Sequence, residues 1–290
     1  MRTLVVGGSG FVGRYLVRHF DAVGTSGRGR DGFPKLDITR RQEVERLFER
    51  FRPELVINAA AMTNVDECER RREEAFMINA DGVRNISEEA HRVKAKMVQI
   101  STDYVFDGAK GDYGEDDPTN PVNVYGSSKL RGELYALERD ALVLRISSPF
   151  GINLGRGKES FFEYVLRALA GGERVKALVD QITTPTFVED VPEAIDALVQ
   201  RGSAGTFHLA VREAISRYEF AIKVAEFAGF EPGRVDRITS REMNFYARRP
   251  RDTSMKTDKI SGSFRTTELS KALKDLVTAA TKHISDHRLI

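Results

Sequence analysis

Short apolar runs alternate with segments of helical periodicity through the first half of the chain. The runs have the length and composition of buried parallel strands and cover residues 3–7, 22–26, 55–60, 97–102 and 141–147. Between them, apolar residues recur at helical spacing, and we expect helices from Thr39 onward and over 73–92 and 126–137. This alternation predicts an α/β fold with a doubly wound parallel sheet.

The alternation loosens after residue 150, where we expect a second part of the molecule. We predict that residues 1–150 form the sheet domain and that 187–211, a helix followed by a short strand, return to it. Residues 151–186 and 212–290 are expected to form a smaller C-terminal lobe. Ligands of such sheets bind at the carboxyl ends of the strands, so we expect this lobe to bind the substrate there.

The composition is that of a globular protein in a reducing compartment. Of the 290 residues, 41% are hydrophobic and 30% are charged, and the formal net charge of +2 predicts no nucleic-acid binding. Cys68 is the single cysteine, which excludes an intramolecular disulfide. No apolar stretch reaches the length of a membrane-spanning helix. We therefore expect a cytoplasmic protein without a membrane partner.

Three glycines follow the first predicted strand at regular intervals: Gly7, Gly10 and Gly13. A glycine turn between a strand and a helix allows backbone N–H groups and the helix dipole to face a pyrophosphate. The pattern predicts a Rossmann domain that binds a dinucleotide, with the spacing typical of short-chain dehydrogenases/reductases. A merely structural turn is the alternative.

Tyr125 and Lys129 are four residues apart in a predicted helix, so both side chains lie on one helix face. There the Lys129 ammonium would stabilise the Tyr125 phenolate and lower the tyrosine pKa. A tyrosine tuned in this way is a proton donor or acceptor near neutral pH. A chance pair on a solvated helix is the alternative, and the glycine loop favours the catalytic interpretation.

The octet at 101–108, Ser-Thr-Asp-Tyr-Val-Phe-Asp-Gly, resembles the signature of the dTDP-4-dehydrorhamnose reductase family, within the extended short-chain dehydrogenases/reductases. The likeness covers nearly the whole chain and includes segments 58–66, 121–126, 129–133, 180–181, 184–186 and 248–250. It implies NAD(P)H-dependent reduction of a keto group on a nucleotide-linked deoxysugar, such as dTDP-4-dehydro-L-rhamnose to dTDP-L-rhamnose.

The resemblance also implies roles for individual residues. Thr102 would hold the substrate carbonyl, Tyr125 would donate the proton, and Lys129 would lower the tyrosine pKa and bind the nicotinamide ribose. Asp103 would contact the sugar, with a loop-capping carboxylate as the alternative. The residues implied along the rest of the cofactor are Gly10, Phe11 and Val12 at the pyrophosphate, Asp37 and Ile38 at the adenine, and Ala60, Ala61, Met62 and Thr63. For Asp37, an acid that precedes a helix is the alternative.

The residues after the second predicted strand favour NADP(H), with NAD(H) still possible. NAD-preferring sites usually place a carboxylate at the end of this strand, on the ribose 2′-hydroxyl, and none occurs here before Asp31. Ser26 and Arg28 could instead bind a 2′-phosphate, because a guanidinium matches phosphate geometry. The alternative is that Arg28 and Arg30 belong to a solvated loop.

The sequence leaves the exact substrate and a non-catalytic role open. Family members commonly carry a tryptophan at the position of Ser148, where we expect a substrate contact. We predict no metal site, and a homodimer is possible. The regulatory β subunit of methionine adenosyltransferase resembles the same family and acts by binding a partner enzyme. A nucleotide-sugar epimerase, the third interpretation, shares the glycine loop and the Tyr/Lys pair but not the octet.

Overall fold

A computed structural model describes residues 1–154 and 159–286 of the chain. Residues 155–158 and 287–290, which fall in the expected C-terminal lobe, lie outside the described residues. The centre of the structure is a six-stranded, all-parallel sheet in the order β2-β1-β3-β4-β5-β8. Its strands are β1 Thr3–Val6, β2 Val23–Gly24, β3 Leu55–Asn58, β4 Lys96–Thr102, β5 Leu142–Ile146 and β8 Gly205–Leu209.

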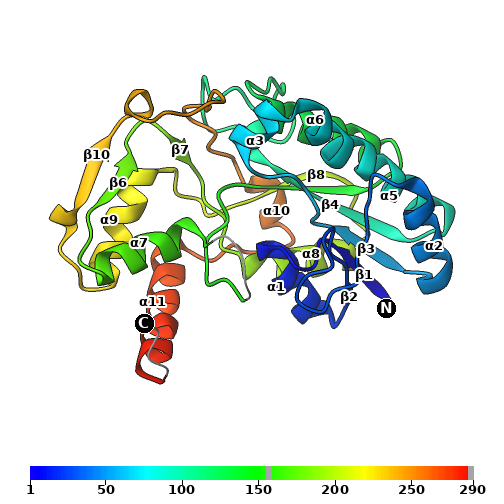
Figure 1. Cartoon of the computed structure of the whole chain (residues 1–290), viewed down its shortest axis with the longest axis horizontal. Helices are drawn as coiled ribbons and strands as arrows, with labels where there is room; N and C mark the ends of the chain where they lie inside the picture. The colour runs from blue at the N-terminus through cyan, green and yellow to red at the C-terminus, as the bar shows by residue number, and fades with distance from the viewer. Residues whose placement is uncertain (155–158, 287–290) are drawn as a thin grey trace.

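Helices cover both faces of this sheet (Figure 1). Along β1, Val5 points to the face covered by α1 and α8, whereas Leu4 and Val6 point to the opposite face. The helices of the two layers are α1 Phe11–Phe20 and α8 Asp190–Gln200 on the first face, and α2 Arg41–Phe51, α5 Gly82–Arg92 and α6 Val124–Leu137 on the second. The predicted doubly wound parallel sheet is therefore confirmed.

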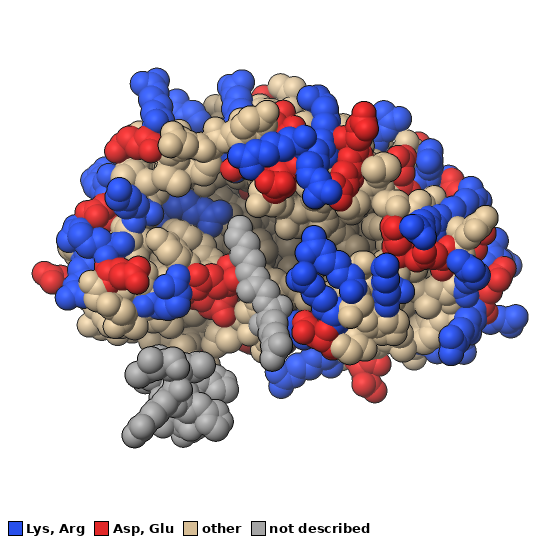
Figure 2. Space-filling model, viewed as in Figure 1, with Lys and Arg blue, Asp and Glu red and all other residues tan. Residues whose placement is uncertain are grey.

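A second group of elements lies beside the sheet, at the left of Figure 1. It packs around a separate apolar cluster that includes Phe150, Phe162 and Phe220. Its strands form two short pairs, β6 Val175–Leu178 with β10 Val235–Ile238 and β7 Ile182–Thr183 with β9 Ile215–Ser216. Its helices are α7 Phe161–Ala170, α9 Arg217–Phe227 and α11 Leu269–Asp286. Figure 2 shows that the surface is hollowed between this group and the sheet.

The short helix α10, Asp258–Ser261, packs against β8 and buries Ile260 in the same apolar cluster as α1 and α8. Within residues 1–154 and 159–286, no helix is long and apolar enough to cross a membrane.

The helix predicted from Thr39 begins at Arg41 instead. Asp37 Oδ1 accepts hydrogen bonds from Thr39 N at 3.0 Å and from Thr39 Oγ1 at 2.7 Å, which forms a turn headed by the aspartate. Thr39 is thus engaged before the helix starts and does not cap it.

The helix predicted over 126–137 begins two residues earlier, at Val124. Asn123 is its N-cap, because the side-chain oxygen accepts a hydrogen bond from Gly126 N at 2.9 Å. The earlier start brings Tyr125 into the first turn of α6.

The helix predicted over 73–92 is interrupted. Two short helices, α3 Val65–Arg70 and α4 Arg72–Phe76, lead into a π-helical turn at Met77–Asp81, and α5 follows. This turn holds Asn79 with its side chain buried, at 1% exposure. π-Helical turns occur often at functional sites, which directs attention to Asn79.

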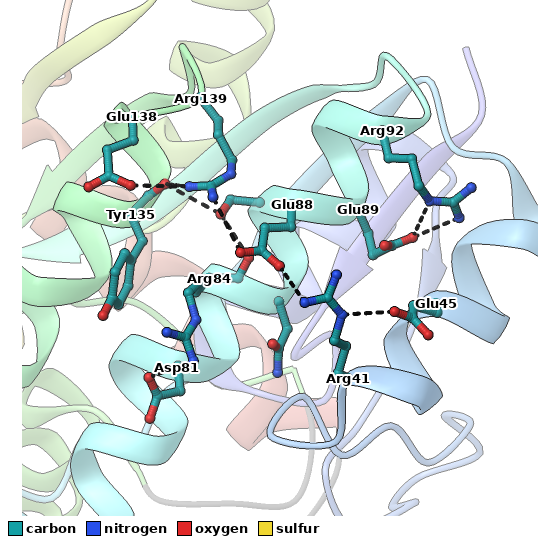
Figure 3. A network of polar contacts seen from close by, with 12 residues as sticks. Arg41, Glu45, Asp81, Arg84, Glu88, Glu89, Arg92, Tyr135, Glu138 and Arg139 are labelled. Carbon is teal, nitrogen blue, oxygen red and sulfur yellow. Dashed lines mark hydrogen bonds and ion pairs between the residues drawn. The ribbon is translucent and has the colours of Figure 1, made fainter.

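Charged side chains join the outer surfaces of α2, α5 and α6 (Figure 3). Glu88 of α5 forms ion pairs with Arg41 of α2 at 3.0 Å and with Arg139, just after α6, at 3.3 Å. Arg41 also pairs with Glu45 of its own helix at 2.8 Å. Exposed pairs contribute about 0–1 kcal/mol each, so the apolar cluster beneath these helices provides most of their attachment to the sheet.

Candidate active site

The loop between β1 and α1 allows an anion to approach the backbone closely. Gly7 has a φ of 83°, in the left-handed region, and a side chain there would meet Ala60 N at 2.5 Å. Gly10 precedes α1, whose first turn carries no acidic residue and no side-chain cap among the described residues. The N–H groups of Phe11, Val12 and Gly13 therefore remain for a ligand at the positive end of the helix dipole. This arrangement fits the pyrophosphate of a dinucleotide.

Ser26 and Arg28, the two residues expected at a 2′-phosphate, have different environments in the segment after β2. Ser26 is buried, and its Oγ accepts hydrogen bonds from the backbone N of Arg28 and of Arg30, both at 3.3 Å. Arg28 is exposed and makes no ion pair in the described part of the chain. Asp31, the first carboxylate of this segment, pairs with Arg14 of α1. Ser26 thus shapes the turn, and Arg28 is the group available to a phosphate.

Ile38 and Asp37, the two residues expected at the adenine, both make contacts within the protein. The Ile38 side chain lies in the core at 5% exposure, so its expected place beside the adenine stays a prediction. Asp37 is partly exposed, and its carboxylate accepts hydrogen bonds from Thr39 ahead of α2. The structural alternative for Asp37 is therefore present in the fold.

The segment after β3, which contains Ala60, Ala61, Met62 and Thr63, is fixed by a buried asparagine. Asn79 Oδ1 accepts from Met62 N at 2.8 Å, and Asn79 Nδ2 donates to Met62 O and to Ser128 Oγ, each at 3.0 Å. One side chain thus connects the expected cofactor segment with the helix that carries Tyr125 and Lys129. Sequence reasoning placed Asn79 on a helix face without a role. Its polar character within an apolar series was the available signal.

Thr102 is the last residue of β4 and lies at the carboxyl edge of the sheet with 5% exposure. Its hydroxyl donates to Asp103 Oδ1 at 3.1 Å and accepts from Tyr104 N at 3.2 Å. Asp103 Oδ2 accepts from Ser147 Oγ at 2.8 Å and from Thr253 Oγ1. Burial raises the pKa of Asp103, and these three hydroxyl groups partly offset that effect.

The carboxylate of Asp103 is enclosed by protein groups, and its expected contact with the sugar stays a prediction. At 2% exposure, the side chain faces the three hydroxyl groups rather than open space. Its place in the site is behind Thr102, whose hydroxyl it orients.

Tyr125 lies in the first turn of α6, with its ring edge-to-face against that of Tyr104 and the ring centroids 5.7 Å apart. Burial raises the pKa of Tyr125, and a hydrogen bond with the Thr102 hydroxyl lowers it only in part. The net pKa of Tyr125 is therefore raised rather than lowered in the ligand-free structure, because burial outweighs the effects that favour the phenolate. The tyrosine keeps its proton at neutral pH.

Lys129 is buried one helical turn after Tyr125, at 5% exposure, and its Nζ donates to Ile100 O at 2.7 Å. Burial lowers the pKa of Lys129 to about 8, while the charge of Glu133 raises it in part. Glu133 is itself held by Arg145, whose Nε and Nη2 donate to it at 3.0 and 2.8 Å. Lys129 is therefore a cation at neutral pH that loses its proton in mildly alkaline solution.

Ser148 follows β5 in an unusual backbone conformation, with a φ of 39°. Its Oγ accepts a hydrogen bond from Arg217 Nη2 at 2.9 Å, so the end of a sheet strand meets the first residue of α9 here. The motif at 180–181 reaches the same area, because Gln181 Nε2 donates to Tyr104 Oη at 2.8 Å. The motif at 184–186 braces the strand end, since Thr186 Oγ1 accepts from the backbone N of residue 147 at 2.9 Å.

The motif at 248–250 connects the second group of elements to the sheet domain. Arg249 forms an ion pair with Asp66 at 3.0 Å, and the backbone O of Arg248 accepts from Asn123 Nδ2 at 2.9 Å. Because Asn123 caps α6, this crossing segment contacts the start of the helix that carries Tyr125.

Comparison with known proteins identifies the family of this site. A family model described as the RmlD substrate binding domain matches residues 1–282. The chain belongs to this family. The resemblance inferred from the octet and the helix motif is thus confirmed.

Named members and neighbours of the family match nearly the whole chain. A dTDP-4-dehydrorhamnose reductase of Aggregatibacter actinomycetemcomitans is 31% identical over 291 residues, which cover 95% of this chain and 98% of that protein. The crystal structure of dTDP-4-dehydrorhamnose reductase from Bacillus anthracis in complex with NADP has a TM-score of 0.87 and 29% identity, and the match covers 96% of this chain and 99% of that one. Methionine adenosyltransferase 2 subunit beta of Danio rerio is 30% identical over 291 residues, 94% of this chain and 89% of that protein.

The site of this family member contains residues that sequence reasoning missed, chiefly Asn79, Tyr104 and Arg217. Each contacts an expected site residue: Asn79 contacts Met62, Tyr104 contacts Tyr125, and Arg217 contacts Ser148. In the part of the chain that the structure describes, no group of three or more His, Cys, Asp or Glu side chains could hold a metal ion.

Proposed function

We propose that the protein is an NADPH-dependent reductase that converts the 4-keto group of a nucleotide-linked deoxysugar to an alcohol, with dTDP-4-dehydro-L-rhamnose as substrate and dTDP-L-rhamnose as product. One observation carries the proposal. Thr102 and Lys129 are buried and Tyr125 is partly buried near the carboxyl edge of the sheet, and the glycine loop after β1 fits a pyrophosphate. The named reductases that resemble the whole chain support the same reaction.

The protonation of the site suits a reduction. When bound, NADPH supplies the hydride. Tyr125 then gives the proton from its Oη to the oxygen of the former ketone. Because burial raises the pKa of Tyr125, this proton is in place at neutral pH. The Thr102 hydroxyl, which donates to Asp103 in this structure, turns to donate to the same oxygen, so two donors face the developing negative charge. The Lys129 ammonium stabilises the phenolate left on Tyr125.

The cofactor would lie along the loop after β1, the segment after β2 and the segment after β3, whose backbone conformations are set by contacts within the protein. Gly7, Gly10 and Gly13 let the loop pack closely on its own backbone and on Ala60, which forms the turn that would hold the pyrophosphate, and Arg28 is the cation available to a 2′-phosphate. Met62, fixed by Asn79, would lie along the nicotinamide side. The related structure from Bacillus anthracis holds NADP, which supports a preference for NADPH with NADH as a weaker cofactor.

A regulatory subunit is the second candidate function. It is favoured by the similarity to methionine adenosyltransferase 2 subunit beta along 94% of this chain. The presence of Thr102, Tyr125 and Lys129, with Tyr125 hydrogen-bonded to Thr102 and Lys129 one helical turn further on, favours the reductase.

The test is the loss of NADPH absorbance after enzymatically generated dTDP-4-dehydro-L-rhamnose is added to the purified protein. We expect consumption of NADPH together with the appearance of dTDP-L-rhamnose, and slower consumption of NADH. Binding of NADPH without turnover, on this substrate and on related keto-sugar nucleotides, would reject the reductase. Co-purification with a methionine adenosyltransferase would then support the regulatory subunit.

A further inference from the structure

Arg217 extends from the first residue of α9 to the end of β5. Its backbone is fixed, because Ser216 and Glu219 cap the helix reciprocally and Arg217 N donates to Gln181 O at 3.2 Å. The guanidinium lies over the ring of Phe161, 5.0 Å from its centroid, and Nη2 donates to Ser148 Oγ at 2.9 Å. A guanidinium carries five N–H donors. Among the described residues, Ser148 Oγ is the one acceptor that this group meets.

This guanidinium is a cation without a paired anion in the described ranges. Asp103 is the carboxylate whose charge acts on it, and that carboxylate is engaged by three hydroxyl groups rather than by Arg217. Burial lowers the pKa of Arg217, and the charges of Tyr104 and Asp103 raise it in part. A sheltered charge without a partner costs free energy in the ligand-free protein.

The backbone conformation of Ser148 is a second source of unfavourable free energy at the same place. Its φ of 39° lies in the left-handed region, which residues other than glycine rarely adopt. The conformation places Ser148 Oγ against Arg217, while the preceding residue, Ser147, directs its hydroxyl to Asp103. Ser148, Phe161 and Arg217 line one pocket. Strained backbone and unpaired charge concentrate at binding sites, where a ligand offsets their cost.

We propose that Arg217, held by Ser148, binds an anionic oxygen of the nucleotide-sugar substrate and is a specificity-determining residue of the site. The inference rests on the function proposed above, because its ligand is a sugar nucleotide. A planar guanidinium with several donors free matches the paired oxygens of a phosphate or a carboxylate. A sugar nucleotide offers this chemistry in two places, its diphosphate and, in acidic sugars, a carboxylate on the ring.

The experiment compares Arg217→Gln with Arg237→Gln as a matched control. Arg237 is an exposed residue of β10 whose guanidinium lies over Tyr218, so the control loses the same charge from the same group of elements but outside the pocket. Binding to the full chain is measured by calorimetry in the presence of NADPH. The four probes are thymidine, dTDP, dTDP-glucose and dTDP-glucuronate. Thermal unfolding of each ligand-free variant is recorded in parallel.

We expect Arg217→Gln to weaken the binding of dTDP and dTDP-glucose by about 10- to 100-fold, the effect of losing a charge-assisted hydrogen bond. Thymidine and NADPH should bind as they do to the unmodified protein. A loss confined to dTDP-glucuronate would also support the proposal and would assign the contact to a sugar carboxylate. The melting temperature of ligand-free Arg217→Gln should not fall, because the variant loses an unpaired charge.

Three results would overturn the proposal. The first is equal affinity of Arg217→Gln and the unmodified protein for all probes. The second is a loss of affinity that extends to NADPH, together with a lower melting temperature. This result would show that Arg217 stabilises the fold rather than binds the substrate. The third is an unmodified protein that binds none of the diphosphate probes. Turnover separates this inference from the proposed function: diphosphate binding that depends on Arg217, without reduction of any keto-sugar nucleotide, would reject the reductase alone.

Discussion

Tyr125 and Lys129 lie one turn apart on α6, and their pKa values move in opposite directions. The pKa of Tyr125 is raised and that of Lys129 falls to about 8, and burial is the largest cause in both cases. Burial disfavours whichever form carries charge, so it keeps the tyrosine protonated and makes the lysine easier to deprotonate. At the residue scale, this combination supplies a proton donor whose phenolate product is stabilised only while Lys129 is charged.

The pH dependence of catalysis follows from Lys129. Its folded-state pKa lies below its ordinary value, so the ammonium is present below about pH 8 and is lost as the pH rises through that value. We expect kcat/KM for the sugar nucleotide, measured at saturating NADPH, to fall on the alkaline side as Lys129 of the enzyme–NADPH complex loses its proton, from a starting pKa of about 8 in the ligand-free protein. Lys129→Arg keeps the charge at higher pH, so any activity it retains should show no such decline. A profile for the unmodified enzyme that stays level into alkaline solution would contradict this assignment.

Arg28 gives a second prediction at the residue scale. Its side chain is exposed and unpaired in the described ranges, and the carboxylate that follows it, Asp31, is held by Arg14. Arg28→Ala should raise the Kd for NADPH by about tenfold or more, the effect of one charge-assisted contact with a phosphate. The Kd for NADH should stay unchanged, which makes NADH the internal control in a fluorescence titration. Equal effects on both cofactors would show that Arg28 does not read the 2′-phosphate.

At the scale of elements, the π-helical turn at Met77–Asp81 adjusts the path between two pieces of the active site. It places Asn79 where its amide contacts both Met62 and Ser128. A displacement of α6 therefore shifts the segment after β3, and a displacement of that segment shifts α6. An uninterrupted helix would shift Asn79 around the axis and remove these contacts.

Asn79→Ala should therefore affect both stability and cofactor binding. The substitution leaves the partly buried backbone N of Met62 without its partner and leaves Met62 O with only the weak donor Cys68 Sγ, and an unsatisfied buried group costs about 1–3 kcal/mol. We expect a lower denaturation midpoint and a higher KM for NADPH, with a smaller change in kcat. Glu88→Gln on the outer face of α5 is a useful control, because it alters an ion-pair network with Arg41 and Arg139 and leaves the contacts of Asn79 in place (Figure 3). Unchanged NADPH kinetics in Asn79→Ala would exclude the positioning role.

The elements that the sequence predicted are those with a local signal. The apolar runs predicted the sheet, and the glycines at 7, 10 and 13 predicted the loop before α1, because a strand, a turn and a helix follow one another directly. The π-helical turn had no such signal, since a single inserted residue hardly disturbs the periodicity of 73–92. The helix was predicted to begin at Thr39, two residues too early, because the hydrogen bonds of the Thr39 amide and hydroxyl to Asp37 have no signal in the apolar periodicity.

At the scale of the whole molecule, the site combines residues that lie far apart in the chain. Thr253 donates to Asp103 across 150 residues, and Arg217 reaches Ser148 from a helix of the second group of elements. Such contacts depend on how two parts of the structure meet, which hydrophobic periodicity does not encode. The prediction of a lowered tyrosine pKa, made from the Tyr/Lys spacing, was wrong because it too depends on tertiary contacts. Spacing places two side chains on one face but does not reveal how deeply tertiary packing buries them.

The central claim is that Tyr125 donates the proton in reduction of a keto sugar, and Tyr125→Phe tests it most directly. Tyr135→Phe is the matched control, because Tyr135 lies on the same helix with its hydroxyl on Arg131, an exposed side chain. Single-turnover reduction of dTDP-4-dehydro-L-rhamnose should slow by about 10²- to 10⁴-fold in Tyr125→Phe, the range for loss of a general acid. The Kd for NADPH and the activity of Tyr135→Phe should remain close to those of the unmodified protein. Full activity of Tyr125→Phe would contradict the account.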